Sequence, residues 1–264
     1  MTTVQDIITW VETTKGWELH HEEGVHYGSA AAEVDKVTVC WKATPEALEE
    51  AGTRGDRLVI GHETLFDPYY SDFDPERTKG WAEWRVNKQR KALLDKYKLT
   101  FLRLHSSIDI LCIGEDMGRW LKLGEPVRTE GKRGSVVWEI KPCTLRQLVT
   151  KVKRISGMSA LRVSAPNGLS QKVRRVGLLV GGAALCPNGG AIQPGVEAGV
   201  DVFIAGETDN YGFRYAAECG IPLIETSHEV SENPGFRHFS EMLKERFPSL
   251  RVSFFENTCP YVTL

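Results

Sequence analysis

Histidine and carboxylate residues recur along this 264-residue chain at spacings that suit metal binding. His105 and Asp109 stand four residues apart, and His228 and Glu232 do the same. On a helix this spacing places both side chains on one face, and in a turn it can still aim both at one ion. Imidazole suits zinc and iron, and a carboxylate can bridge two cations. These residues therefore predict a site for one or two divalent metal ions.

Each group of potential ligands follows an apolar segment that we expect to form a strand. The segments and the groups after them are 58–60 with His62 and Glu63, 101–104 with His105 and Asp109, and 222–226 with His228 and Glu232. Carboxyl ends of parallel strands converge on the crevice where open α/β sheets bind ligands. A single His-x-x-x-Asp pair is more often a surface pair than a ligand pair. Three such groups use three of the seven histidines, so we predict one shared cleft.

Strand and helix signals alternate along the whole chain. Apolar strand segments are expected at 36–41, 56–60, 99–104, 136–141, 173–180, 200–205 and 222–225, and helical patterns at 4–14, 44–51, 80–97, 144–154, 195–199, 215–219 and 234–246. The alternation predicts an α/β fold of two lobes, whose mixed, largely parallel sheets are covered by helices. We place the lobes at residues 1–125 and 126–264, together forming one metal cleft at strand carboxyl ends.

Composition narrows the classes of partner. With 41% hydrophobic and 26% charged residues the chain is expected to be globular, and a formal net charge of −2 gives no basic patch for nucleic acid. The longest uncharged run, 176–196, is broken by prolines and glycines, so a buried strand and loop explain it better than a membrane span. The N-terminus lacks a secretory pattern, and the six cysteines are scattered among apolar neighbours, which favours buried thiols and a cytoplasmic location.

Two other motifs invite alternative interpretations. His20, His21, Glu22 and Glu23, with His26, could form a second metal site, but the polarity of the segment favours a solvated loop. Gly181–Gly182 could cradle a phosphate, but no GxGxxG or Gly-Lys-Ser/Thr motif follows. Turn glycines are the better account.

The ordered set of motifs resembles the Nif-three-like dinuclear metal-centre hexameric proteins, often described as GTP cyclohydrolase type-two homologues. The resemblance covers nearly the whole chain. It rests on His-Glu-Thr-Leu-Phe at 62–66, His-Ser-Ser-Ile-Asp at 105–109, Asp-Val-Phe-Ile-Ala-Gly-Glu at 201–207 and Ser-His-Glu-Val-Ser-Glu at 227–232. It implies a homohexamer in which His62, His105, Asp109, His228 and Glu232 are ligands and Glu232 bridges two ions. Glu63 replaces the family's usual second histidine, and its oxygen would favour harder ions such as manganese over zinc or iron.

Two ions bridged by a carboxylate and a water lower the pKa of that water and polarise an electrophile. We therefore expect a metal-dependent hydrolase acting on a nucleotide, phosphoester or purine-type small molecule. The general base would be the bridging hydroxide or one of Glu63, Glu207 and Glu229. The alternative function is a non-catalytic one, in which the chain stores or delivers metal or regulates a partner.

Overall fold

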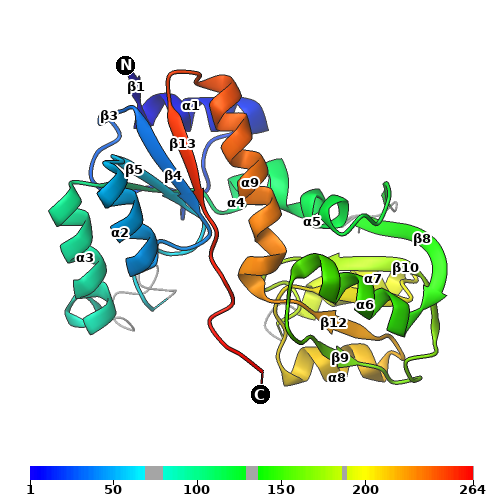
Figure 1. Ribbon diagram of the computed structural model, residues 1–264. Helices are drawn as coiled ribbons and strands as arrows, with labels where there is room; N and C mark the ends of the chain where they lie inside the picture. Colours follow the sequence, from blue (N-terminus) through cyan, green and yellow to red (C-terminus); the bar gives the residue numbers. More distant parts are fainter. Residues whose placement is uncertain (69–79, 129–135, 186–188, 264) are drawn as a thin grey trace. The chain divides into compact units, whose positions relative to one another are not determined.

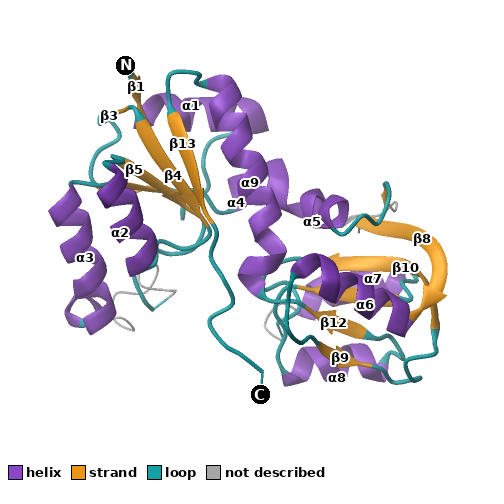
Figure 2. Cartoon of the chain, in the orientation of Figure 1, coloured by secondary structure: helices purple, strands orange, loops and turns teal. Residues whose placement is uncertain are grey.

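The computed structural model describes residues 1–68, 80–128, 136–185 and 189–263. The chain forms two compact units: Met1–Cys112 with Gly235–Asn257, and Ile113–Pro234 with Thr258–Leu264. Each unit is an α/β layer structure with its own sheet (Figures 1 and 2). The α/β expectation is therefore confirmed. Among the described helices, none combines the length and apolarity needed to cross a bilayer.

The first unit is built on a five-stranded sheet of order β13-β4-β5-β6-β2. Its strands are β2 (Gly24–Tyr27), β4 (Lys36–Cys40), β5 (Leu58–Gly61), β6 (Thr100–Arg103) and β13 (Arg251–Phe255). β13, β4, β5 and β6 pair in parallel, and β2 pairs antiparallel with β6. β5 and β6 are buried along their whole length, as central strands covered on both faces must be. A short pair, β1 (Thr2–Thr3) with β3 (Glu33–Val34), lies apart from this sheet.

Helices cover both faces of this sheet (Figure 1). The helices are α1 (Val4–Lys15), α2 (Pro45–Arg54), α3 (Arg85–Tyr97) and the part of α9 (His228–Arg246) that belongs to this unit, with a short 3-10 turn η1 (Trp81–Glu83) before α3 and α4 (Ser106–Ile108) after β6. α2 and α3 pack Leu48 and Leu94 into one core with Phe101 of β6. On α1 and α9, Trp10 stacks on Phe239 with ring centroids 5.8 Å apart.

Side-chain caps set where these helices begin. The Thr3 hydroxyl accepts from the Asp6 backbone and the Asp6 carboxylate accepts from the Thr3 backbone, which is a capping box at the start of α1. Thr44 caps α2, and Pro45 occupies its first turn, where a missing N–H costs nothing.

The second unit is built on a six-stranded sheet of order β7-β8-β10-β11-β12-β9. Its strands are β7 (Pro126–Arg128), β8 (Val136–Thr144), β9 (Arg162–Ser164), β10 (Lys172–Leu179), β11 (Val202–Ala205) and β12 (Leu223–Glu225). Only β10, β11 and β12 run parallel to one another, and the outer strands are antiparallel. The sheet is thus mixed, as expected.

Two hydrophobic clusters cover the faces of this second sheet. The helices of the unit are α5 (Gly114–Trp120), α6 (Leu145–Ser156), α7 (Gly189–Glu197), α8 (Asn210–Glu218) and the start of α9. One cluster contains Met117 of α5 and Leu148 of α6, and the other contains Ile192 of α7 and Ala216 of α8.

The structure departs from the sequence expectations at three elements. β13 pairs with β4, so residues 235–257 group with the N-terminal unit, whereas we had expected a continuous lobe over 126–264. β2 lies in a stretch interpreted as polar loop, because pairing with β6 supplies backbone partners that its sequence does not reveal. α9 begins at His228 rather than at Pro234.

The cysteine expectation holds only in part. Cys40 and Cys112 are buried, and burial raises the pKa of Cys40 to about 12, which makes that thiol unreactive. Cys143 and Cys259 are half-buried and Cys219 is exposed. Cys186 lies outside the described residues.

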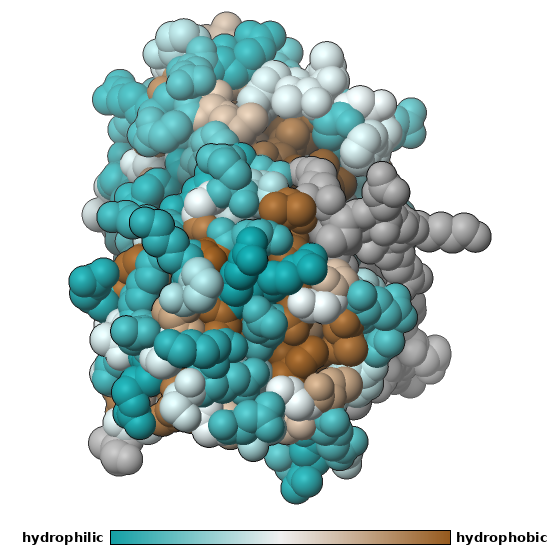
Figure 3. Space-filling model, turned by 90° about the vertical axis from the view of Figure 1, so that its right-hand side faces the viewer, coloured by the Kyte–Doolittle hydropathy of each residue, from teal (hydrophilic) through white to brown (hydrophobic). Residues whose placement is uncertain are grey.

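The surface in Figure 3 is mostly hydrophilic, with hydrophobic side chains gathered in smaller patches. Large apolar side chains that are exposed, such as Trp17, Trp84 and Tyr211, are scattered along the sequence. Scattered exposed apolar residues are ordinary on protein surfaces.

Gly61, the last residue of β5, lies so close to the Phe101 ring that no side chain fits at this position. A Cβ at this position would stand 2.6 Å from Cε2 of the Phe101 ring. We expect Gly61→Ala to lower the free energy of unfolding by about 1–3 kcal/mol, the usual cost of overpacking a core. Urea denaturation measures this cost.

Phe101→Leu removes the ring atoms that clash. The double variant Gly61→Ala/Phe101→Leu should therefore lose less stability than the sum of the two single losses. Additive losses would show that the strain at Gly61 has another source.

Candidate metal centre

Parallel pairing of β5 and β6 brings His62 and His105 to the same edge of the first sheet. Gly61 is in register with Arg103, and each histidine follows its strand within two residues. The two imidazole rings lie with centroids 4.3 Å apart. The His62 backbone is fixed on both sides, since its N–H donates to the Trp41 carbonyl at 2.9 Å and its carbonyl accepts from Nε of Arg103 at 3.1 Å.

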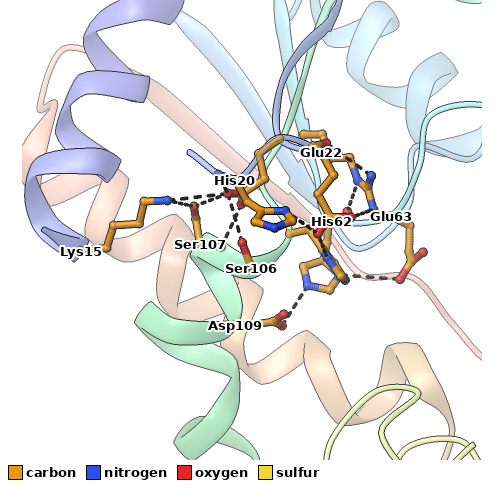
Figure 4. A network of polar contacts seen from close by, with 11 residues as sticks. Lys15, His20, Glu22, His62, Glu63, Ser106, Ser107 and Asp109 are labelled. Atoms are coloured by element: carbon orange, nitrogen blue, oxygen red, sulfur yellow. Dashed lines mark hydrogen bonds and ion pairs between the residues drawn. The ribbon is translucent and has the colours of Figure 1, made fainter. Parts of the chain in front are cut away.

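The His62 ring lies between two carboxylates (Figure 4). Its Nε2 is 3.0 Å from Oδ1 of Asp109, and its Nδ1 is 3.7 Å from Oε1 of Glu63. Asp109 follows α4 and begins a π-helical turn, Asp109–Ile113, and its backbone N–H donates to the His105 carbonyl at 3.1 Å. One turn after His105, the chain thus places the Asp109 carboxylate beside the imidazole of His62.

The electrostatics of this group favour an ionised Asp109. Burial alone would raise the pKa of its carboxyl, but the charge and hydrogen bond of His62, with the charge of His105, outweigh burial and hold the pKa below its ordinary value. Asp109 is therefore a carboxylate at neutral pH, which is the form that binds cations.

Donor atoms of His62, Glu63 and His105 all lie within 4.8 Å of one another. Ligand atoms that each stand about 2.0–2.2 Å from one ion lie roughly 3–4 Å from each other. The 3.7 Å between Nδ1 of His62 and Oε1 of Glu63 falls in that range. Two histidines and one glutamate also match a common donor set of catalytic zinc sites, which leaves a position open for water or substrate. The residues present fit a divalent metal ion.

Residues of the segment 20–23 contact His105 and the start of α4. Nδ1 of His105 is 2.8 Å from Oε1 of Glu22. The Glu23 carboxylate accepts from the Ser107 backbone at 2.8 Å and from the Ser107 hydroxyl at 2.9 Å, which anchors the start of α4. Lys15 of α1 donates to the Ser107 hydroxyl at 3.0 Å, as Figure 4 shows.

The interpretation of residues 20–23 as a solvated loop is confirmed for His20 and His21, which are exposed in a loop, but it is wrong for Glu22 and Glu23. Glu23 is buried, and Glu22 contacts a candidate ligand. The only sequence signal was the Glu-Glu pair directly before Gly24, where β2 begins. The Glu-Glu pair can be linked to His105 only once β2 is known to pair with β6, the strand that precedes His105.

The second unit presents its own group at the carboxyl ends of β10, β11 and β12. Gly181, Glu207 and His228 follow these three parallel strands within three residues. His228 places Nδ1 3.0 Å from Oε2 of Glu207 and Nε2 3.5 Å from Oε1 of Glu232. The last pair spans one turn of α9, as the four-residue spacing indicated.

Gly181 gives this group its close packing. Its backbone has φ +59°, and a Cβ there would overlap Oε1 of Glu232 and stand 3.0 Å from Nε2 of His228. Its N–H donates to the Ser231 hydroxyl at 2.9 Å, and that hydroxyl donates to the His228 carbonyl at 2.6 Å. Gly181 is thus a turn glycine, as expected, and only glycine lets the chain approach this carboxylate so closely.

The remaining acidic residues near His228 have other partners. Glu229 is buried, and its Oε1 accepts from the Ser227 hydroxyl at 2.7 Å. Glu225, at the end of β12, pairs with Arg162 and accepts from the Thr208 backbone at 2.9 Å. Of the three glutamates proposed as bases, Glu63 and Glu207 lie beside histidine rings, and Glu229 contacts a serine hydroxyl.

These features define a class of two-unit α/β proteins with histidine and carboxylate clusters at the ends of parallel strands. The family model of Duf34/NIF3 (NGG1p interacting factor 3) matches residues 2–260, and the chain belongs to that family.

Relatives and solved structures extend this finding. The "GTP cyclohydrolase 1 type 2 homolog" of Neisseria meningitidis serogroup A is 27% identical over 270 residues, covering 97% of this chain and 98% of that protein. The "Protein NIF3 homolog" of Schizosaccharomyces pombe is 31% identical over 107 residues, which span 40% of this chain and 36% of the yeast protein.

Among solved structures, Staphylococcus aureus protein SA1388 has a TM-score of 0.78 at 15% identity, covering 100% of this chain and 99% of that one. Protein ybgI, described as of unknown function, has a TM-score of 0.79 at 19% identity, with 98% and 100% covered. At these identities the likeness concerns the fold.

The buried Glu23 carboxylate makes stability depend on pH. Burial would raise its pKa, but hydrogen bonds from Ser107 and His20 and the charge of Lys15 lower it below the ordinary value. A carboxyl with a depressed folded-state pKa stabilises the fold above its unfolded pKa, and that stability is lost as pH falls through the folded pKa. The wild type should therefore lose more stability than Glu23→Gln between about pH 5 and pH 3.

At neutral pH we expect Glu23→Gln to cost about 1–3 kcal/mol, because a charged hydrogen-bond acceptor is lost in a buried site. Urea denaturation across this pH range measures both effects. Parallel pH profiles of the two proteins would contradict the assigned role of Glu23.

Proposed function

We propose that this protein binds one or two divalent metal ions and hydrolyses a nucleotide, phosphoester or purine-type substrate. The observation that carries the proposal is the convergence of His62, Glu63 and His105 donor atoms within 4.8 Å in the first unit. Two imidazoles and a carboxylate are the types of ligand that a divalent transition metal binds in proteins.

In this proposal each unit contributes its own ligand group. The first unit supplies His62, His105 and Asp109, and the second supplies His228 and Glu232, which stand within 3.5 Å of each other. Support comes from the chemistry of each group by itself: both combine imidazole with carboxylate at the carboxyl ends of parallel strands. Glu63 is a further oxygen ligand or the general base.

A bound divalent ion supplies Lewis acidity and lowers the pKa of a water. The chain's own residues would hold the ion and accept the proton. Ionised Asp109 offers an oxygen beside Nε2 of His62. Glu63, whose Oε1 lies 3.7 Å from Nδ1 of His62, would take a proton from the attacking water.

The names of the relatives agree with this class of substrate. The protein of Neisseria meningitidis is named "GTP cyclohydrolase 1 type 2 homolog", and GTP is a purine nucleotide. We extend this substrate class to the present chain as a proposal, with a small-molecule substrate and zinc, iron or manganese as the ion.

Metal content tests the proposal directly. After incubation with zinc, manganese or iron(II) and desalting, elemental analysis of the wild type should find about one to two ions per chain, the number that the ligand set can hold. Glu232→Ala should lose half or more of this metal, because it removes a carboxylate ligand. Glu241→Ala is the matched control, since Glu241 is an exposed glutamate on the same helix that pairs only with Lys244 among the contacts described.

The same proteins are then assayed for turnover of nucleotides and phosphoesters. Glu63→Gln should keep at least one ion and lose about 10²–10⁴-fold in turnover if Glu63 is the base. A wild type that holds no transition metal would refute the proposal. Bound metal without turnover on any substrate would instead indicate metal storage, delivery or regulation.

We further propose a cytoplasmic homohexamer. The basis is the resemblance of the motif set to hexameric proteins and the family membership of the chain. Light scattering at micromolar concentration should give a mass about six times the 29.5 kDa of one chain. A monomer or dimer at that concentration would contradict the assembly.

A further inference from the structure

Two candidate ligand histidines share one feature outside the ligand set itself. In each, Nδ1 faces a glutamate. Nδ1 of His105 lies 2.8 Å from Oε1 of Glu22, and Nδ1 of His228 lies 3.0 Å from Oε2 of Glu207. The two pairs belong to different units and come from unrelated segments. The arrangement therefore arises twice, on two different sheets.

A glutamate at Nδ1 decides which nitrogen of a neutral imidazole can bind a cation. The neutral ring carries one N–H and one lone pair, and a carboxylate can only accept. The proton is therefore held on Nδ1, and the lone pair is left on Nε2. In His228 the freed Nε2 is the atom that faces Oε1 of Glu232 at 3.5 Å.

Glu22 itself contacts a buried cation, the guanidinium of Arg103. Arg103 is fully buried, and its Nη2 lies 3.5 Å from Oε2 of Glu22. The same guanidinium donates to the Glu22 carbonyl at 3.4 Å and to the His62 carbonyl at 3.1 Å. One oxygen of Glu22 thus faces Arg103 while the other faces His105.

We propose that Glu22 and Glu207 are positioning residues that fix the Nδ1–H tautomer and the ring orientation of His105 and His228, so that Nε2 of each is presented to a metal ion. The inference rests on the proposed metal site. It also gives Glu207 a role different from that of a general base. The third histidine does not enter the proposal, because Glu63 lies 3.7 Å from Nδ1 of His62, beyond hydrogen-bonding distance.

The tautomer can be measured without any metal. Long-range ¹H–¹⁵N spectra of the metal-free protein at about pH 8, where an ordinary histidine is neutral, distinguish the Nδ1–H ring from the Nε2–H ring. In the wild type both His105 and His228 should be in the Nδ1–H form. Glu22→Ala should change the tautomer balance of His105 alone, and Glu207→Ala that of His228 alone.

Glu207 keeps the test decisive if Glu22→Ala does not fold. The Glu207 side chain is 47% exposed, so its removal disturbs no core, whereas Glu22 is 13% exposed and lies against buried Arg103. Glu18→Ala is the matched control, because Glu18 is an exposed glutamate in the same segment as Glu22. It should leave both rings unchanged.

Metal affinity then tests the consequence of the orientation. Titration with zinc or manganese should show affinity reduced about 10–100-fold by Glu207→Ala or Glu22→Ala, the usual effect of losing a residue that orients a ligand. Glu207→Gln should restore part of the affinity, because its amide oxygen can still accept from Nδ1–H.

An Nε2–H tautomer in the wild type, or variants that leave the tautomers or the affinity unchanged, would overturn the positioning role. A wild type with both rings in the Nδ1–H form but no bound metal would overturn the proposed function instead. The two failures are therefore distinguishable.

Discussion

Parallel hydrogen bonding between neighbouring strands is the constraint on which both ligand groups depend. β5 and β6 pair from Leu58 with Thr100 to Gly61 with Arg103, so both strands end at the same edge. The next residues along each strand direction must then emerge side by side. β11 and β12 repeat this geometry, and β10 pairs with β11 in the same sense. A shift of one residue in either register would turn the strand's side chains to the opposite faces and separate the ligands.

Placing charge inside the first unit requires partners for each charged group. Burying an ion without a partner costs several kcal/mol, so a buried cation must contact acceptors or a carboxylate. Arg103 contacts two backbone carbonyls and lies near the Glu22 carboxylate. Lys15 and Glu23 form a buried pair at 3.7 Å that meets at Ser107. The polar network that supports His105 therefore brings each of these buried cations close to a carboxylate.

Much of this arrangement could be predicted from the sequence because its signals are local. Apolar runs ending in histidine marked β5 and β6, and four-residue spacing placed Glu232 beside His228. The supporting residues could not be found in this way. Glu22 lies 83 residues from His105, and its importance appears only when β2 pairs with β6. β13 was missed for a related reason, because it is stabilised as a strand by parallel pairing with β4, more than 200 residues earlier. Pro234 suggested a helix start, but α9 accommodates it in its second turn.

The order of residues within the two units has a consequence for synthesis on the ribosome. The core of the second unit comes from one continuous stretch, Ile113–Pro234, whereas the first unit is completed only by Gly235–Asn257. β13 covers one edge of the first sheet, and Phe239 packs against Trp10 of α1. A nascent chain therefore exposes the unpaired side of β4 and one face of α1 while all of the second unit's sheet is already available to pair. The half of the protein that is translated first is the half that must wait longest for its last strand.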